Sequence, residues 1–232
     1  MPEPIDLLAR PVYGMAQVDW NLRLPPGTAR RWIDGYTRGG KKYPPIVRLQ
    51  STGDEIVTWG EFTETRHLSE YRRDGISMAK MRPAVERLRD LFNTQYPLAA
   101  ARPWLQEQGR ELVLSMQEEV GLEKHLLLVV VRNNQLALSL QTRQFIDSVD
   151  FGRSQYVERM HPLPELDQVW FDPRRQFGEP VVRSVPTSII AEQARAGDHL
   201  DTIADLYELT GEEVWQAIRY ELLRGGDAPQ AA

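Results

Sequence analysis

A double-proline turn near the start of the chain constrains its fold more than any other feature. The sequence Leu24-Pro25-Pro26-Gly27 separates two segments with helical patterns. Proline cannot continue a helix, because it lacks an amide hydrogen and its ring clashes with the preceding turn, but it is well tolerated where a helix begins. The turn therefore predicts two short helices, over about residues 15–22 and 28–36, with Trp32 and Ile33 of the second helix turned inward.

A basic segment surrounds this turn. Residues 1–98 contain 15 Lys or Arg against 12 Asp or Glu, whereas residues 99–232 contain 13 against 21. Within residues 10–48 only Asp19 and Asp34 oppose eight cations. These cations are Arg10, Arg23, Arg30, Arg31, Arg38, Lys41, Lys42 and Arg48. A compact basic segment at the head of an acidic chain favours a surface for a polyanion, and the alternative is an ordinary solvated face.

The two helices, the tight turn and the basic loop at residues 37–42 have the order of a helix-turn-helix motif. In that motif the second helix enters the major groove, and its flanks contact the phosphates. We expect Thr28 and Arg30 to contact bases or phosphates near the start of the second helix. The residues expected beside the DNA backbone, as a wing, are Arg31, Arg38, Lys41 and Lys42. The alternative is a helical hairpin whose exterior happens to be charged.

Two further helices complete the first region, residues 1–98. Thr58-Trp59-Gly60-Glu61 is a capping box and predicts a helix that reaches about Arg73, closed by Asp74-Gly75. Ser77 is expected to cap the next helix, in which Pro83 predicts a kink or a late start. One face of this last helix repeats at helical spacing and is interpreted as core: Met78, Met81, Val85, Leu88 and Phe92.

The middle region, residues 99–168, has the period of β-strands. Leu112, Leu114 and Met116 alternate along the chain, which predicts a strand. Hairpins are predicted from the arms 126–131 and 135–140, and from the arms 144–151 and 155–160. We therefore expect a small, mainly antiparallel central sheet.

The last region, residues 169–232, returns to helix after two short strands near residues 169–171 and 180–182. Three helices are predicted at Thr187–Ala196, Leu200–Tyr207 and Glu212–Arg224, and a second capping box, Thr210 to Glu213, announces the third. Residues 225–232 are expected to be a disordered tail. The predicted fold class is α+β, with an N-terminal winged helix-turn-helix, the central sheet and a C-terminal three-helix domain.

The sequence lacks residues that several classes of protein require. The chain has no cysteine, which excludes disulfides, thiolate nucleophiles and cysteine-based zinc sites and is typical of a cytoplasmic protein. No apolar run approaches the roughly 20 residues of a membrane span, and the first residues do not have the pattern of a secretory signal. We therefore expect a cytoplasmic chain that does not enter a membrane.

The residues also give no pattern for catalysis. The histidines His67, His125, His161 and His199 are not spaced as a metal pair. Ser77-Met78-Ala79-Lys80 matches the Ser-x-x-Lys of serine acylases, but the accompanying motifs are absent, so Ser77 is interpreted as a helix cap. We expect no catalytic residue, no metal site and no cofactor, and we do not expect an enzyme. Clustered carboxylates with perturbed pKa values in a cleft would favour the enzyme alternative.

The first region resembles a MerR-type winged helix-turn-helix. The residues that carry the resemblance are Tyr13-Gly14-Met15-Ala16, Leu24-Pro25-Pro26, the segment from Thr28 to Tyr36, Thr58 to Phe62, and Gly75 to Met78 with Met81-Arg82. The segment Asp19-Trp20-Asn21 departs from the pattern, because small or apolar residues are usual there.

The last region resembles a three-helix domain of bacterial antitoxins. The matching segments are Phe171 to Pro173, Phe177 to Val182, Thr187 to Ile189, Ala196 to Asp198, Ile203 to Tyr207 and Val214 to Ile218. Ser184-Val185-Pro186 departs from the Arg-Gly-Thr usual before the first helix. Taken together, the chain resembles a VapB-class antitoxin of a type II toxin–antitoxin pair. The resemblance implies a PIN-domain ribonuclease toxin as partner and repression of the chain's own operon.

The second helix is so short that one copy contacts too few phosphates for tight, specific DNA binding, so we also expect a homodimer. An antitoxin of this class often blocks the Mg²⁺ site of its toxin with an arginine that pairs with the metal-binding carboxylates. Four arginines are candidates for this contact, and the sequence does not distinguish them: Arg174, Arg175, Arg219 and Arg224. The alternative is a stand-alone MerR-like regulator whose central sheet binds a small effector, which predicts no ribonuclease gene beside this one.

Overall fold

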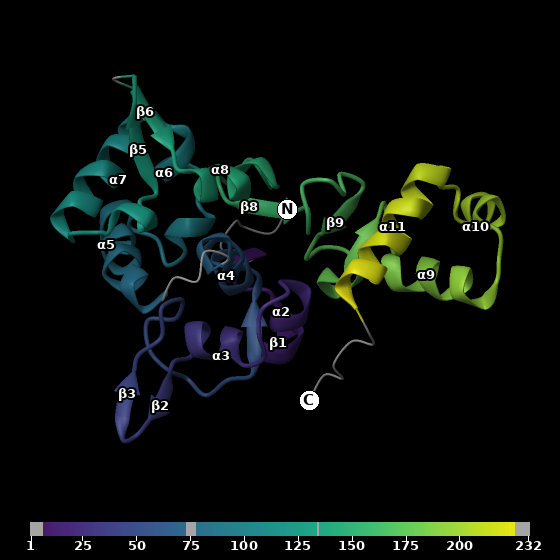
Figure 1. Ribbon diagram of the computed structural model, residues 1–232, viewed down its shortest axis with the longest axis horizontal. Coiled ribbons are helices and arrows are strands. Elements are labelled where there is room, and N and C mark those ends of the chain that lie inside the picture. The colour runs from purple at the N-terminus through teal and green to yellow at the C-terminus, as the bar shows by residue number, and fades with distance from the viewer. Residues whose placement is uncertain (1–6, 73–77, 134, 226–232) are drawn as a thin grey trace.

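The protein is an α+β structure, as the sequence predicts. The computed structural model describes residues 7–72, 78–133 and 135–225. Figure 1 shows the helices α5 to α7, within residues 82–119, and the C-terminal helices at opposite sides of the molecule, with the helix α4, Trp59–Arg72, between the N-terminal and middle elements. Trp59, Phe62 and Tyr71 of α4 are fully buried, so this helix supplies much of the core.

The N-terminal elements are arranged around a small two-stranded sheet. Strand β1, Pro11–Gly14, pairs antiparallel with β4, Ile56–Thr58. The chain between these strands forms α2, Met15–Asn21, α3, Thr28–Ile33, and the strands β2, Tyr36–Arg38, and β3, Lys41–Tyr43. The two helices predicted around the double-proline turn are confirmed, although α3 ends three residues earlier than expected.

The capping box at the start of α4 is confirmed. The amide of Thr58 donates to a Glu61 carboxylate oxygen at 2.9 Å, and the amide of Glu61 donates to the Thr58 hydroxyl at 3.3 Å. The expected end of this helix at Asp74-Gly75 and the expected cap at Ser77 lie outside the described residues.

A short 3₁₀ turn, η1, Met78–Met81, then leads into α5, Arg82–Phe92. Pro83 occupies the second position of α5, so it delays the helix rather than kinking it. The predicted core face is confirmed, because all five of its residues are buried: Met78, Met81, Val85, Leu88 and Phe92.

The strand predicted around residues 112–116 is wrong. These residues belong to the helix α7, Glu107–Glu119, which follows the short helix α6, Arg102–Leu105. Its buried positions, Gly109, Val113 and Met116, recur at helical spacing, whereas Leu112 is 37% exposed. A Cβ at Gly109 would lie 2.0 Å from the carbonyl oxygen of Arg102, so the glycine permits the close approach of the two helices.

Both hairpins of the middle region are present, but both are shorter than predicted. Strands β5, Val129–Arg132, and β6, Gln135–Leu138, pair antiparallel, and so do β7, Val149–Phe151, and β8, Val157–Met160. Residues 144–147, expected in a strand, lie in the helix α8, Leu140–Asp147. The Ser139 hydroxyl caps this helix by accepting from the amide of Thr142 at 3.2 Å.

The larger sheet crosses residue 168, where we expected the central region to end. Its five antiparallel strands have the order β11-β10-β9-β8-β7. The additional strands are β9, Val169–Phe171, β10, Pro180–Val182, and β11, Val185–Pro186. Residues 99–168 are therefore not mainly a sheet, since they contain α6, α7 and α8 and only part of the five-stranded sheet.

The C-terminal helices agree closely with prediction. Helices α9, Thr187–Ala196, and α10, Leu200–Tyr207, have the expected bounds, and α11, Gly211–Arg224, begins one residue early. The second capping box is confirmed by reciprocal bonds between Thr210 and Glu213, at 2.7 and 3.2 Å. The expected tail lies outside the described residues from 226 onward. Of the helices in the described segments, none combines the length and the apolar character that crossing a bilayer requires.

A buried histidine joins α4 to α8. The ring of His67 stacks on Phe145 with centroids 4.2 Å apart, and its nitrogens lie 3.3 Å from the Leu98 carbonyl oxygen and 3.4 Å from the Thr142 hydroxyl. Burial lowers the pKa of His67 to about 3. The folded protein therefore holds a neutral imidazole where the unfolded chain takes up a proton near pH 6.5.

This difference predicts that the protein becomes less stable as the pH is lowered. Because the pKa of His67 is lower in the folded state, its contribution is complete above about pH 6.5 and is lost as the pH falls toward 3, by at most about 1.4 kcal/mol per pH unit. His67→Gln, which keeps an amide at the site and does not titrate, should remove this part of the pH dependence. Urea denaturation between pH 4 and 7 measures it, with the exposed His125→Gln as control. An unchanged slope in His67→Gln would contradict the assignment.

Candidate nucleic-acid interface

The turn between α2 and α3 is held by a carboxylate from the first helix. Asp19 is buried, and its two oxygens accept from the amides of Gly27 at 2.6 Å and Ala29 at 2.7 Å. Gly27, which stands just before α3, has no side chain to cap the helix and adopts a φ of 75°. Asp19 therefore satisfies amides at the start of α3 that would otherwise lack partners.

Trp20 and Asn21 connect α2 to the last helix. The Arg224 guanidinium stacks over the Trp20 ring at 3.2 Å and donates to the Asn21 amide oxygen at 2.6 Å. Arg23 donates to the carbonyl of Leu223 at 2.8 Å. Figure 1 shows the end of α11 beside α2. Each residue of the segment that departs from the MerR pattern thus has a structural partner, either at the start of α3 or on α11.

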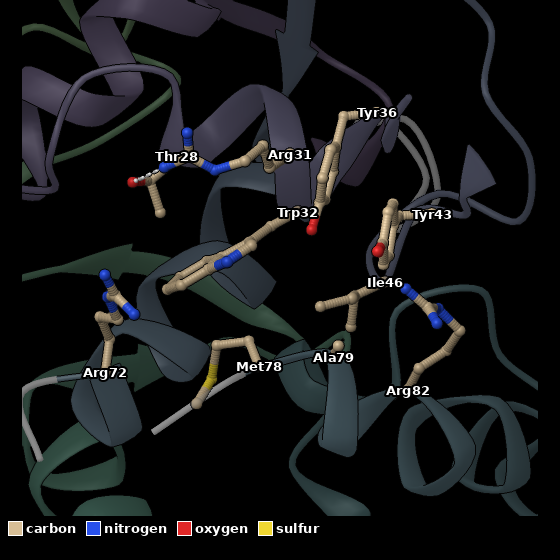
Figure 2. A pocket seen from close by; sticks show the side chains of 10 residues that line it. All are labelled: Thr28, Arg31, Trp32, Tyr36, Tyr43, Ile46, Arg72, Met78, Ala79 and Arg82. Carbon is tan, nitrogen blue, oxygen red and sulfur yellow. Dashed lines mark hydrogen bonds between the residues drawn. The ribbon is translucent and has the colours of Figure 1, made fainter. Parts of the chain in front are cut away.

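One face of α3 is buried and the other carries cations. Ala29, Trp32 and Ile33 are buried, whereas Arg30 and Arg31 are exposed. The expected base or phosphate contact of Thr28 does not fit, because the residue is only 1% exposed. Its hydroxyl accepts from the Arg31 guanidinium at 2.9 Å, as Figure 2 shows, so Thr28 orients Arg31 instead.

Arg30 has an acidic neighbour at the surface. It forms an ion pair with Glu55, and both side chains are about half exposed, at 49% and 48%. Exposed ion pairs of this kind contribute only about 0–1 kcal/mol, because water and salt screen them. A DNA phosphate can therefore compete with Glu55 for this guanidinium.

The basic loop expected at residues 37–42 is a hairpin. Strands β2 and β3 pair in register from Tyr36 opposite Tyr43 to Arg38 opposite Lys41. Gly39-Gly40 has φ values of 57° and 74°, which a two-residue turn of type I′ requires. In Figure 1 this hairpin projects from the molecule next to α3. Its exposed cations are Arg38, Lys41 and Lys42.

The base of the hairpin is fixed against its neighbours. At Gly35, which has a φ of 79°, a Cβ would lie 2.6 Å from the Tyr43 carbonyl oxygen and 2.9 Å from the Pro45 nitrogen. The rings of Tyr36 and Tyr43 are stacked with centroids 4.6 Å apart. Arg82 of α5 donates to the Pro45 carbonyl at 3.0 Å. The hairpin is therefore an anchored wing rather than a flexible loop.

Arg48 does not belong to the cationic surface, although it lies in the basic segment. It is buried and donates to Asp34 at 3.0 Å and to Glu61 at 2.7 Å. Burial raises the pKa of Asp34, but the Thr52 amide and the Arg48 guanidinium outweigh burial and hold it at about 2. This network fixes the chain between the wing and β4 behind α3.

The four candidate arginines for a toxin contact differ in their surroundings. Arg174 pairs with Glu158 at 2.8 Å, Arg175 pairs with Asp172 at 3.5 Å, and Arg219 lies over the Trp215 ring at 5.3 Å. The side chain of Arg224 is only 8% exposed and is held between α11 and α2. Arg224 is therefore a structural residue and does not fit as a donor to another protein.

No metal site is evident in the ranges that the structure describes: the His, Asp and Glu side chains there form no group of three that could hold an ion. His67 and His161, two of the histidines considered in the sequence, instead pack on Phe145 and Trp170.

The comparison with known proteins shows the family. The chain is 38% identical over 221 residues to the uncharacterized protein Rv2308 of Mycobacterium tuberculosis, and the alignment covers 92% of this chain and 91% of the mycobacterial protein. The chain belongs to the family of that protein. It is also similar to the crystal structure of Rv2018 from Mycobacterium tuberculosis, with a TM-score of 0.72, 25% identity, and coverage of 90% of this chain and 97% of that one.

Residues 169–220 match the family model described as a protein of unknown function, DUF433. The matched segment runs from β9 into α11 and contains the motifs that resemble antitoxins. It begins at the residue where we expected the last region to start.

Sequence reasoning missed Asp19 as the residue that fixes α3. The signal was present, because a charged residue on the inner side of a helix needs a partner when it is buried. The partners, however, are backbone amides eight and ten residues away, which no side-chain pattern reveals.

The Asp19 contacts predict a loss of stability on truncation. Asp19→Ala leaves the amides of Gly27 and Ala29 without their acceptor and should lower the free energy of unfolding by about 1–2 kcal/mol. Urea denaturation at pH 7 measures the change. Glu118→Ala, at an exposed position of α7, is the control and should change little. Equal stability of the two variants would show that Asp19 does not hold the turn.

Proposed function

We propose that this protein is an antitoxin that binds operator DNA through α3 and the wing, represses its own operon and neutralises a PIN-domain ribonuclease toxin. The observation that carries the proposal is the arrangement of five exposed cations on two adjacent elements, the second helix of a helix-turn-helix and the hairpin that follows it. These cations are Arg30, Arg31, Arg38, Lys41 and Lys42. The proposal assigns the chain no catalytic role.

The order of elements supports the DNA-binding half. Helix, turn, helix and hairpin follow one another from α2 to β3, and the inner face of α3 is packed while its outer face carries the arginines. A helix in the major groove needs such an outer face, and a basic wing beside it neutralises phosphates.

The antitoxin half is supported by the C-terminal segment. Residues 169–220 match a family model as a unit, and the same segment carries the antitoxin-like motifs. Trp215 and Leu222 of α11 are spaced by seven residues and are 46% and 71% exposed, so one face of this helix presents apolar surface to a partner. Residues 99–232 are also acidic, with 13 Lys or Arg against 21 Asp or Glu.

Removal of single cations should weaken DNA binding. Arg30→Ala and Arg31→Ala should each lower the affinity for a duplex from the region upstream of the gene by about 5-fold to 10-fold. Each should also make the slope of log affinity against log salt concentration shallower, by about the amount that one phosphate contact contributes. Fluorescence anisotropy at several salt concentrations measures both effects. Arg132→Ala, at an exposed arginine of the β5–β6 hairpin, is the matched control. If both variants bind like the control, α3 is not the DNA surface.

The toxin half has its own test. The product of an adjoining ribonuclease gene, expressed together with this chain, should form a complex in which ribonuclease activity is suppressed. Leu222→Asp should weaken that complex about tenfold or more, because it places a charge in an apolar contact, whereas Leu49→Asp, at an exposed leucine of the N-terminal part, should not. Absence of such a gene, or of a complex with its product, would favour the stand-alone regulator.

A further inference from the structure

A cavity of about 220 Å³ lies beside α3, between the wing, the end of α4 and the start of α5. Figure 2 shows the side chains that surround it. They are Thr28, Arg31, Trp32, Tyr36, Tyr43, Ile46, Arg72, Met78, Ala79 and Arg82. The residues come from four separate parts of the described chain, so the cavity exists only in the folded protein.

Among the described residues that line the cavity, three carry a guanidinium group and none carries a carboxylate. Arg31 donates to the Thr28 hydroxyl, and Arg82 donates to the carbonyls of Pro44 and Pro45, so the hydrogen-bond acceptors of both guanidinium groups are uncharged oxygens. Arg72 has no hydrogen bond or ion pair with any residue in the described ranges. Three positive charges around one small space favour an anion there.

The remaining surface of the cavity is aromatic and apolar. Figure 2 shows the Trp32 indole in the middle of the cavity lining, with the stacked rings of Tyr36 and Tyr43 on one side and Met78 below. Trp32 is only 7% exposed and borders the cavity with a small part of its surface, whereas Tyr36 is 39% exposed and offers more ring surface. A flat apolar group that enters the cavity can lie against these rings.

We propose that this cavity binds a small aromatic carboxylate. The carboxylate pairs with the arginines, for which the planar guanidinium is well suited, and the ring packs against Trp32 and the tyrosines. The volume agrees with a molecule of one or two rings, since a cavity of about 150 Å³ admits benzene. A bare inorganic anion would leave the aromatic surface without a contact, and a neutral ring would leave the guanidiniums without a counter-charge.

The proposal is independent of the DNA-binding role, because its test contains no nucleic acid. The two sites share Arg31, which borders the cavity and also belongs to the outer face of α3. For this reason the test uses Arg72, which lies at the end of α4 and is not among the proposed DNA contacts.

Isothermal titration calorimetry on the full chain tests the site with three probes: 2-naphthoate, 2-naphthamide and inorganic phosphate. We expect 2-naphthoate to bind at a single saturable site, and the amide and phosphate to bind at least about tenfold more weakly. Arg72→Gln should weaken 2-naphthoate binding about tenfold, which is the effect of losing one charge-assisted hydrogen bond. Arg132→Gln, at an exposed arginine of β5 outside the cavity, is the matched control and should bind like the original chain.

Each contrary result removes a defined part of the proposal. Absence of saturable 2-naphthoate binding, or equal binding by Arg72→Gln and the original chain, would overturn the site. Equally tight binding of 2-naphthamide would overturn recognition of the carboxylate, and equally tight binding of phosphate would overturn recognition of the ring. Thermal denaturation of Arg72→Gln shows whether the variant is folded, and a folded variant is expected because Arg72 is partly exposed and makes no described polar contact.

Discussion

The carboxylate of Asp19 is the contact on which the arrangement of the N-terminal elements depends. It accepts hydrogen bonds from the amides of Gly27 and Ala29 across the double-proline turn and so fixes α3 relative to α2. The outer face of α3 can present arginines only because its inner face is held in this way and packed through Trp32 and Ile33. A buried carboxylate is costly without partners, and here two backbone amides supply them.

Three further sets of contacts extend this arrangement to the rest of the molecule. The buried Asp34, Arg48 and Glu61 hold the chain behind α3, and Arg82 holds the base of the wing. Next to Asp19 in α2, the Trp20 ring stacks against the guanidinium of Arg224 from α11. The proposed DNA-binding helix pair and the proposed toxin-binding segment therefore meet directly at α2, where a change in one can affect the other.

Elements with local signals were predictable from the sequence, and those that depend on distant contacts were not. The capping boxes at Thr58 and Thr210 and the bounds of α9 and α10 are encoded by residues within one helical turn. The alternation from Leu112 to Met116 indicated a strand, because a sequence pattern does not show that α6 packs against Gly109. The cationic residues of the candidate interface were predicted, but the burial of Thr28 depends on tertiary packing. The cavity beside α3 combines four distant segments and has no sequence signature.

Hydrogen exchange on the full chain, with and without a duplex from its own upstream region, tests the central claim most directly. Mass spectrometry of the exchanged peptides reports which backbone amides the duplex protects. The account predicts slower exchange over residues 28–43, which contain α3 and the wing, and no comparable change over residues 187–224. Protection of α9 to α11 without protection of residues 28–43 would contradict it.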